Sequence, residues 1–352
     1  MADRTGLSNF LATDNVPDAL FGIPVVSRED DYTERDLAFF REHPEAGGYY
    51  DLGEGTPDDG SDEGAPVQND EPAKFYGLRS DGSIKGPGWI GEVPIPGGGI
   101  ATEYAVGVNL DGKDVEIPLF VPTLNPSEVK TLAGETIPNN GAIPDAIMDK
   151  AIAFARENLA RGQSPFKPSG IETFASRNPS LFKHVKKFET LKLEPYDDVG
   201  GLAIGYGAHL DADGNLVTKD TKIDETQAIS MLARDLYTRR QRLAETLPNW
   251  KYIPGNAKQA LLDVSMGRDD VLSAAQSGGL HRDLKAAGRN ADKLLAAVKK
   301  HYYSYRKSDN PNHQAGLETR RIAGGKLFFG EDFSYDGKTW DSVRGFVAKG
   351  GL

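Results

Sequence analysis

Two carboxylates near the middle of the chain have the spacing of an acid–base pair. Glu189 follows an amphipathic stretch that ends at Phe188, and Asp198 comes later, at a turn before a glycine-rich hairpin. A glutamate beside apolar residues can hold a proton, whereas an aspartate in a wet, polar hairpin stays ionised. Two such groups across a groove are what glycoside hydrolysis requires: one protonates the leaving oxygen, and the other activates water or stabilises positive charge. Glu194 and Asp197, beside this pair, are expected to be solvated surface charges.

The same stretch resembles the phage-type lysozymes, the muramidases of the T4 and P22 type. Glu189, Tyr196, Asp198 and the run Ile204–Gly207 match the signature of that family. Similar segments follow at 226–236, 259–267 and 316–321, so the resemblance covers roughly residues 171–332. It implies a lysozyme-like fold, with Glu189 as the general acid and Asp198 as the second catalytic carboxylate.

Further site residues follow from the same resemblance. The family has a threonine that helps to position the attacking water where this chain has Ala203. Position 203 is therefore the expected water-positioning position, without its hydroxyl group. Tyr206 and His209 are expected to line the substrate groove, although a single backbone hydrogen bond at the hairpin edge is an equal expectation for His209. Arg320 and Arg321 are expected to be salt-bridge anchors rather than substrate contacts.

Length and composition limit the classes of function. A chain of 352 residues is expected to form two or three domains. The net charge is −11, with an acidic first half that argues against nucleic-acid binding and a basic second half that suits an anionic wall polymer. There is no cysteine, and the six histidines are scattered, so neither a metal site nor a cofactor is expected. No secretory signal or membrane span is evident, so we expect synthesis in the host cytoplasm and action in the virion, the periplasm or the cell wall.

The pattern along the chain predicts an α+β protein whose larger part is a mainly helical domain with a small β-hairpin lobe. The expected order is an N-terminal, virion-anchoring segment at 1–50, an acidic disordered linker at 51–73, a small α+β module of unknown role at 74–168, the lysozyme-like domain at 171–332 and a tail at 333–352. A hairpin turning at Asp111-Gly112 and helices beginning near 126 and 144 are expected in the module. In the lysozyme-like domain we expect helices at 179–190, 226–246, 255–268, 291–302 and around 318–327, and a hairpin at 202–217.

The sequence thus predicts a peptidoglycan hydrolase that acts on glycan strands, carried in the virion and used in genome entry. Phage tail or ejection proteins are the expected partners of the N-terminal half. Three alternatives stay open: a late lysis endolysin, a structural virion protein with a degenerate lysozyme fold, and a transglycosylase that uses Glu189 alone.

Overall fold

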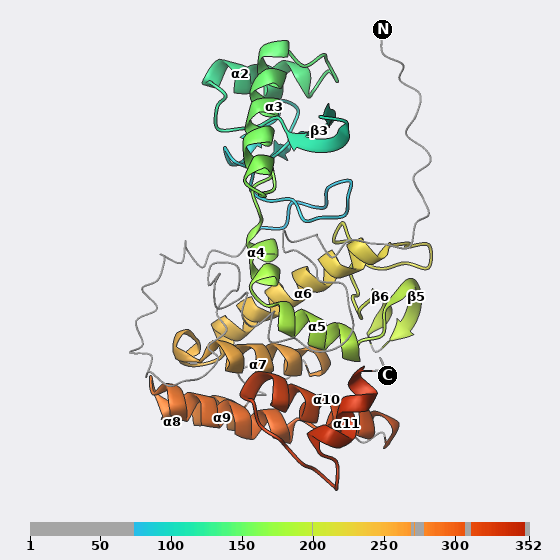
Figure 1. The fold of residues 1–352 in the computed structure, drawn as a ribbon, viewed down its shortest axis with the longest axis vertical. Coiled ribbons are helices and arrows are strands. Elements are labelled where there is room, and N and C mark those ends of the chain that lie inside the picture. Colours follow the sequence, from blue (N-terminus) through green and yellow to red (C-terminus); the bar gives the residue numbers. More distant parts are fainter. Residues whose placement is uncertain (1–73, 199, 269–270, 272–277, 307–310, 349–352) are drawn as a thin grey trace.

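The computed structural model describes residues 74–198, 200–268, 271, 278–306 and 311–348. Two parts are evident in Figure 1: a small module above and a larger helical body below, joined by a narrow neck. The expected segments at 1–50 and 51–73 lie outside the described residues. Within the described ranges the secondary structure is mainly helical, with two-stranded antiparallel sheets, as the α+β prediction requires.

The small module consists of two hairpins followed by helices. Its elements are β1 (Val93–Pro94), β2 (Ile100–Ala101), β3 (Ala105–Leu110), β4 (Lys113–Pro118), α2 (Pro126–Thr131), a π-helical turn η2 (Leu132–Thr136) and α3 (Asp145–Ala160). The expected Asp-Gly turn joins β3 to β4, because Asp111 and Gly112 both adopt positive φ, at 54° and 85°. Helix α2 begins at Asn125, whose side chain accepts a hydrogen bond from the Glu128 amide, and Pro126 takes the first helical position. Ile117, Leu119 and Phe120 are at the centre of a separate module core.

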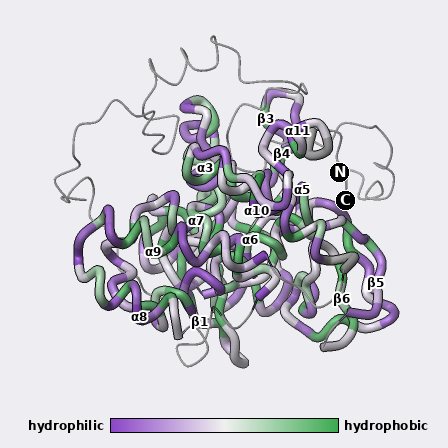
Figure 2. Tube along the Cα trace, turned by 90° about the horizontal axis from the view of Figure 1, so that it is seen from below, coloured by the Kyte–Doolittle hydropathy of each residue, from purple (hydrophilic) through white to green (hydrophobic). Residues whose placement is uncertain are grey.

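The helical body contains one hairpin and a set of helices around a central one. Its elements are α4 (Gly170–Ser176), α5 (Pro179–Phe188), β5 (Lys192–Asp198), β6 (Gly201–Gly205), α6 (Glu225–Thr246), η3 (Trp250–Tyr252), α7 (Gly255–Gly267), α8 (Gly278–Ala287), α9 (Ala291–Ser304), α10 (Pro311–Phe329) and α11 (Trp340–Ala348). Helix α7 contacts α5, α6, α9 and α10, and it lies among them in Figure 2. The fold therefore places the ends of several helices around α7.

The hairpin lobe begins earlier in the sequence than predicted. Tyr196, Asp197 and Asp198 lie in strand β5 rather than in a turn, and the turn falls beside Gly200 and Gly201, which have positive φ. Strand β6 covers only Gly201–Gly205, and the rest of the expected hairpin at 202–217 forms single bridges and loops. The physical reason is that the two glycines supply the backbone conformation of the turn, which the Asp-Asp pair cannot adopt as readily.

The body begins before the predicted boundary at residue 171. Ile84 is 1% exposed and belongs to the same core cluster as Ile171 and the buried face of α6, with Phe75 and Leu78 packed against that cluster. The hydroxyl of Ser230 in α6 donates a 2.7 Å hydrogen bond to the Gly82 carbonyl. Residues 75–86, hereafter the strap, are therefore part of the helical body. Hydrophobic packing thus groups the strap with the body, although the sequence placed these residues in a module at 74–168.

A buried ion cluster joins the strap to both parts. Arg79 donates from Nη2 to Glu103 of the module at 2.7 Å and from Nη1 to Glu172 of α4 at 3.2 Å. The side chains of Arg79 and Glu103 are 4% and 3% exposed. The two ends of the module also meet here, since a Cβ atom placed on Gly86 would lie 2.2 Å from the Lys167 carbonyl oxygen. The module is thus an insertion between the strap and α4.

Candidate active site

Helix α5 positions Glu189 at its C-terminal end. The apolar side of this helix, with Leu181, Val185 and Phe188, is buried in the body, which fixes the direction in which the helix ends. Glu189 itself has extended backbone angles and caps the helix. Its Oε1 accepts a 2.5 Å hydrogen bond from Nη1 of Arg320 in α10, and its side chain is 27% exposed. The predicted carboxylate is therefore held by a buried cation while it stays reachable from solvent.

The second predicted carboxylate lies at the end of strand β5. Asp198 is exposed and pairs in register with Gly201 across the turn. Tyr196, two residues earlier, is half-buried, and its pKa is raised by burial and then by the negative charges of Asp198 and Glu189. Both carboxylates are thus close enough to one phenol group to act on it electrostatically. Glu189 and Asp198 therefore both act on Tyr196 through their charge.

The remaining predicted site residues take different positions. Ala203 pairs with Tyr196 across the hairpin and is 0% exposed, so its methyl group does not face solvent. Tyr206 is 6% exposed and packs in the main core, and burial raises its pKa to about 12, with Glu225 adding to the effect. In this structure Tyr206 is therefore a packing residue, not part of an open groove. Nδ1 of His209 lies 3.0 Å from the Leu202 carbonyl oxygen, the edge hydrogen bond that was its alternative expectation.

Behind Glu189 lies a group of charged side chains, hereafter the buried charge cluster, that consists of His184, Asp263, Tyr302, Arg320 and Arg321. Asp263 in α7 is 0% exposed and accepts from Nε of Arg320 at 2.6 Å, from Nη1 of Arg321 and from the Tyr302 hydroxyl at 3.0 Å. Nε2 of His184 lies 3.4 Å from the same carboxylate, longer than an ordinary hydrogen bond. Arg320 and Arg321 are ion-pair anchors, as the sequence predicted, and Arg320 bridges Asp263 to Glu189.

The protonation states in this cluster follow from burial and charge together. Burial would raise the pKa of Asp263, but Arg320 and Arg321 hold it well below its usual range. Burial lowers the pKa of His184, so its ring is neutral near pH 7. Burial would also lower the pKa of Arg320, yet Asp263 and Glu189 raise it above its usual value. Arg320 therefore contacts both carboxylates, and Arg321 contacts Asp263.

The sequence analysis missed Asp263 and His184. Asp263 sits in the apolar run Ala260-Leu261-Leu262, where an acidic residue on the buried side of a helix signals a charge that needs a buried partner. His184 carried no such signal, because one histidine in an amphipathic helix is compatible with either face. Two aromatic residues in or near this cluster take part in packing. Tyr302 is fully buried, and the ring of Tyr303 stacks on Phe333 with centroids 3.9 Å apart.

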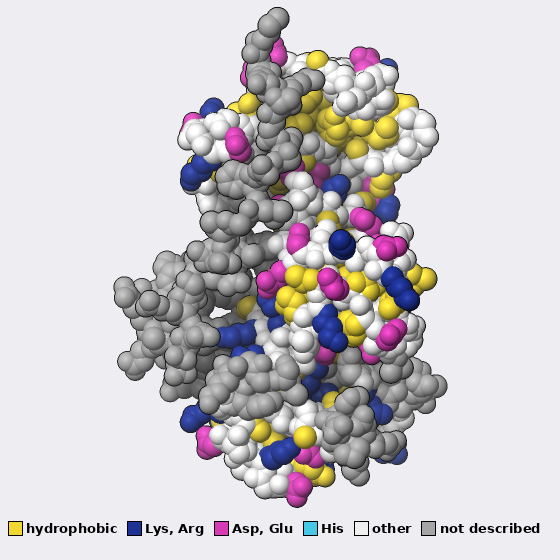
Figure 3. All heavy atoms as spheres, turned by 90° about the vertical axis from the view of Figure 1, so that its right-hand side faces the viewer, with side chains coloured by type: hydrophobic (Ala, Val, Ile, Leu, Met, Phe, Trp, Pro, Cys, Tyr) yellow, Lys and Arg dark blue, Asp and Glu magenta, His cyan; other side chains and the backbone are white. Residues whose placement is uncertain are grey.

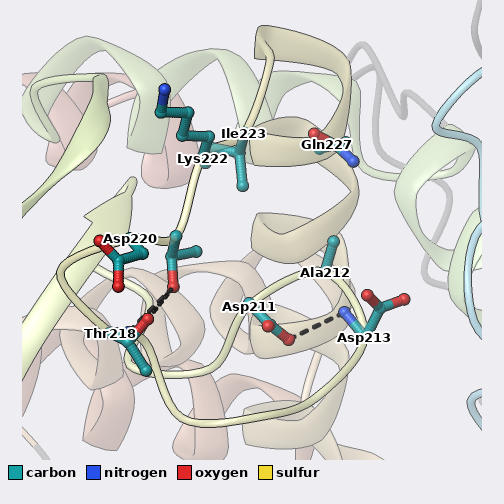
Figure 4. A pocket seen from close by; sticks show the side chains of 9 residues that line it. Asp211, Ala212, Asp213, Thr218, Asp220, Lys222, Ile223 and Gln227 are labelled. Carbon is teal, nitrogen blue, oxygen red and sulfur yellow. Dashed lines mark hydrogen bonds between the residues drawn. The ribbon is translucent and has the colours of Figure 1, made fainter.

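A separate hollow lies on the loop that follows the hairpin. It is lined by Asp211, Ala212, Asp213, Thr218, Asp220, Thr221, Lys222, Ile223 and Gln227 (Figure 4). The Asp211 carboxylate is turned onto its own loop, where it accepts from the amides of Asp213 and Asn215 at 3.0 and 2.8 Å. Neither Glu189 nor Asp198 lines this hollow. Its acidic residues therefore organise a turn, and the chemistry of the predicted pair lies elsewhere.

The face that carries the hairpin lobe is turned toward the viewer in Figure 3. Basic, acidic and apolar side chains are mixed over the body on this face, and apolar side chains gather over the module. Within the ranges that the structure describes, no group of three or more His, Asp or Glu side chains is arranged to hold a metal ion. None of the described helices combines the length and the apolar character needed to cross a bilayer.

Comparison with known proteins identifies one segment. The sequence model of the phage lysozyme family matches residues 186–323, which include Glu189, Asp198, Asp263 and both arginines. None of the curated proteins matches the chain. Among solved structures, the endolysin from Escherichia coli O157:H7 phage FAHEc1 has 21% identity and a TM-score of 0.33, over 44% of this chain and 94% of that one. A mutant of P22 lysozyme has 20% identity and a TM-score of 0.33, over 42% and 94% of the two chains. The segment 186–323 is therefore similar to the phage lysozyme family.

Proposed function

We propose that this protein is a muramidase that hydrolyses the β-1,4 bond between N-acetylmuramic acid and N-acetylglucosamine in peptidoglycan. The family match supports a peptidoglycan hydrolase of the glycoside hydrolase class. The observation that supports the finer assignment is the different setting of the two carboxylates: Glu189 is paired with the buried Arg320, whereas Asp198 is exposed at the end of β5. Two carboxylates in such different environments are suited to different protonation roles.

In this proposal Glu189 is the general acid and Asp198 the second carboxylate. Glu189 donates its proton to the glycosidic oxygen as that oxygen leaves the anomeric carbon, where positive charge develops. Asp198 either takes a proton from the water that attacks the anomeric carbon or stabilises the positive charge there. Glu189 then regains a proton from solvent, which its 27% exposure allows.

Matched amide substitutions test the two roles. Glu189→Gln keeps the shape of the side chain and removes the proton donor, so clearing of purified peptidoglycan should fall by about 10²–10⁴-fold or more. Asp198→Asn should cause a comparable loss in a hydrolase but little loss in a transglycosylase that uses Glu189 alone. Glu194→Gln and Asp197→Asn are the controls, because both residues are exposed neighbours on β5 and should keep full activity. An active Glu189→Gln protein would end the assignment.

The released sugars separate hydrolysis from the alternatives. New reducing ends indicate a hydrolase, whereas anhydro-muramyl ends indicate a transglycosylase. A protein that binds peptidoglycan and releases neither is a structural protein with a degenerate lysozyme fold, which the missing hydroxyl at Ala203 would favour. We further propose that the enzyme is carried in the virion and acts in genome entry, with phage tail or ejection proteins as partners of the N-terminal half. Its absence from purified particles would favour a late lysis endolysin.

A further inference from the structure

The guanidinium of Arg320 is shared between two carboxylates. Nη1 donates to Glu189 at 2.5 Å, and Nε donates to Asp263 at 2.6 Å. Asp263 is fully buried on α7, so its position does not depend on solvent or on a mobile side chain. The same carboxylate also binds Arg321 and the Tyr302 hydroxyl. These contacts hold the planar guanidinium group of Arg320 in one orientation. They thereby fix the position of Nη1, the atom that donates to Glu189.

The charges in this part of the molecule balance only when Glu189 is ionised. Arg320 and Arg321 are cations, Asp263 is an anion, and His184 is neutral because burial lowers its pKa. A protonated Glu189 leaves one positive charge in excess. A cation beside a carboxyl group favours its ionised form, whereas a general acid has to hold its proton. Without Asp263, Arg320 would keep Glu189 as its ion-pair partner, and its charge would no longer be offset by a second carboxylate.

We propose that Asp263 is a positioning residue for the general acid: it holds Arg320 in place against Glu189 and offsets the positive charge of Arg320. This inference rests on the proposed role of Glu189. The charged and titratable groups around the site enter the balance. They are His184 on α5, Lys192, Tyr196 and Asp198 on β5, Asp263 on α7, Tyr302 on α9, and Arg320 and Arg321 on α10, and Lys192 Nζ lies 3.8 Å from the Tyr196 ring centroid. Of these, Asp263 and Asp198 carry the negative charge, and only Asp263 bonds to the cation that binds Glu189.

The prediction is a shift in the pH dependence of the whole protein. In a plot of activity against pH, activity should fall on the alkaline side as the general acid loses its proton. This fall is hereafter the alkaline limb of the profile. In Asp263→Asn this alkaline limb should move down by about one pH unit, because an uncompensated cation favours ionisation of the adjacent carboxyl group. In Arg320→Gln, which removes that cation and leaves Asp263, the limb should move up. A purely structural role would lower activity at every pH without moving the limb.

The control is a carboxylate with similar partners outside the cluster. Asp283 on α8 accepts a hydrogen bond from Lys300 and lies 2.9 Å from the His301 ring nitrogen, so Asp283→Asn breaks an ion pair and should leave the limb in place. If Asp263→Asn fails to fold, the double variant Asp263→Asn/Tyr302→Phe also removes the hydroxyl that donates to Asp263, keeps both cations and should still show the downward shift. Circular dichroism establishes folding before each profile is measured.

The outcomes are distinct. A downward shift for Asp263→Asn or its double variant, with an upward shift for Arg320→Gln, supports the proposal. Folded Asp263 variants whose limb stays at the wild-type position overturn it, as does an Arg320→Gln profile that does not move. An active Glu189→Gln variant refutes the proposed function itself. If Glu189→Gln is inactive and the alkaline limbs of the Asp263 and Arg320 variants do not move, this inference alone is refuted.

Discussion

The packing of the strap predicts that residues 75–86 are required for a stable enzyme, although they precede the matched family segment by about a hundred residues. Ile84 is 1% exposed within the main core. Truncation of a buried isoleucine to alanine costs about 2–5 kcal/mol, because apolar contacts are lost and a cavity remains. A domain is stabilised by only about 5–15 kcal/mol in total. For a body of this size the cost corresponds to a fall of about 4–20 °C in the melting temperature.

The matched control for Ile84→Ala is Ile117→Ala. Ile117 is 0% exposed, but it lies in the separate core of the module. Both changes remove the same atoms from a buried site, so they differ only in which core is damaged. We expect Ile84→Ala to lower the temperature at which peptidoglycan-clearing activity is lost, and Ile117→Ala to leave that temperature nearly unchanged.

Two deletions extend the same test. A fragment that begins at residue 170 lacks the strap and should be much less stable than the full chain. A second protein, in which residues 87–164 are replaced by a Gly-Gly linker, keeps Ile84 and the Arg79–Glu172 pair and should retain activity and most of its thermal stability. Heat-inactivation midpoints, measured by turbidity clearance, compare the two. Equal midpoints for the two deletions, or for Ile84→Ala and wild type, would refute the reasoning.

Two further predictions concern the site and the N-terminal region. Ala203→Thr adds a hydroxyl opposite Tyr196, but position 203 is fully buried, so the rate of clearing should not rise and the added atoms should cost about 1–3 kcal/mol in a thermal melt. A higher rate with an unchanged melting temperature would contradict both parts of this expectation. Removal of residues 1–73 leaves the strap in place and should abolish incorporation into particles while clearing activity persists. Normal packaging of that shortened protein, measured by immunoblot of purified virions, would rule out anchoring through this region.

Local sequence signals predicted most of the helical body. The amphipathic patterns of α5, α6, α7 and α9 gave boundaries within a few residues of those observed, since buried faces and caps act over short distances. The last long helix begins at Pro311 rather than near Glu318, and α8 and α11 were not predicted. The Asp111-Gly112 turn was predicted correctly, because positive φ at two successive positions strongly favours those residue types.

The candidate site was predictable in part. Glu189 and Asp198 were proposed from their spacing and the family resemblance and stay a prediction, whereas Arg320 and Arg321 were expected to be ion-pair anchors and do form ion pairs. Asp263 and the strap were not found, because their partners are distant in the sequence and no short motif records such a pairing. Tyr206 was expected in the groove, yet the ring is part of the core, since the hairpin folds back onto α6. Long-range packing, rather than local propensity, accounts for each of these differences.

The position of the module within the chain has a consequence for how the protein folds as it is synthesised. The strap leaves the ribosome first, but Gly82 bonds to Ser230, which is 148 residues further along. The module, whose core is formed by residues close in sequence, can fold long before α6 is made. The strap can therefore pair with the module through Arg79 and Glu103 before its partners in the body exist. Completion of the main core is in this way delayed until α6 has been made.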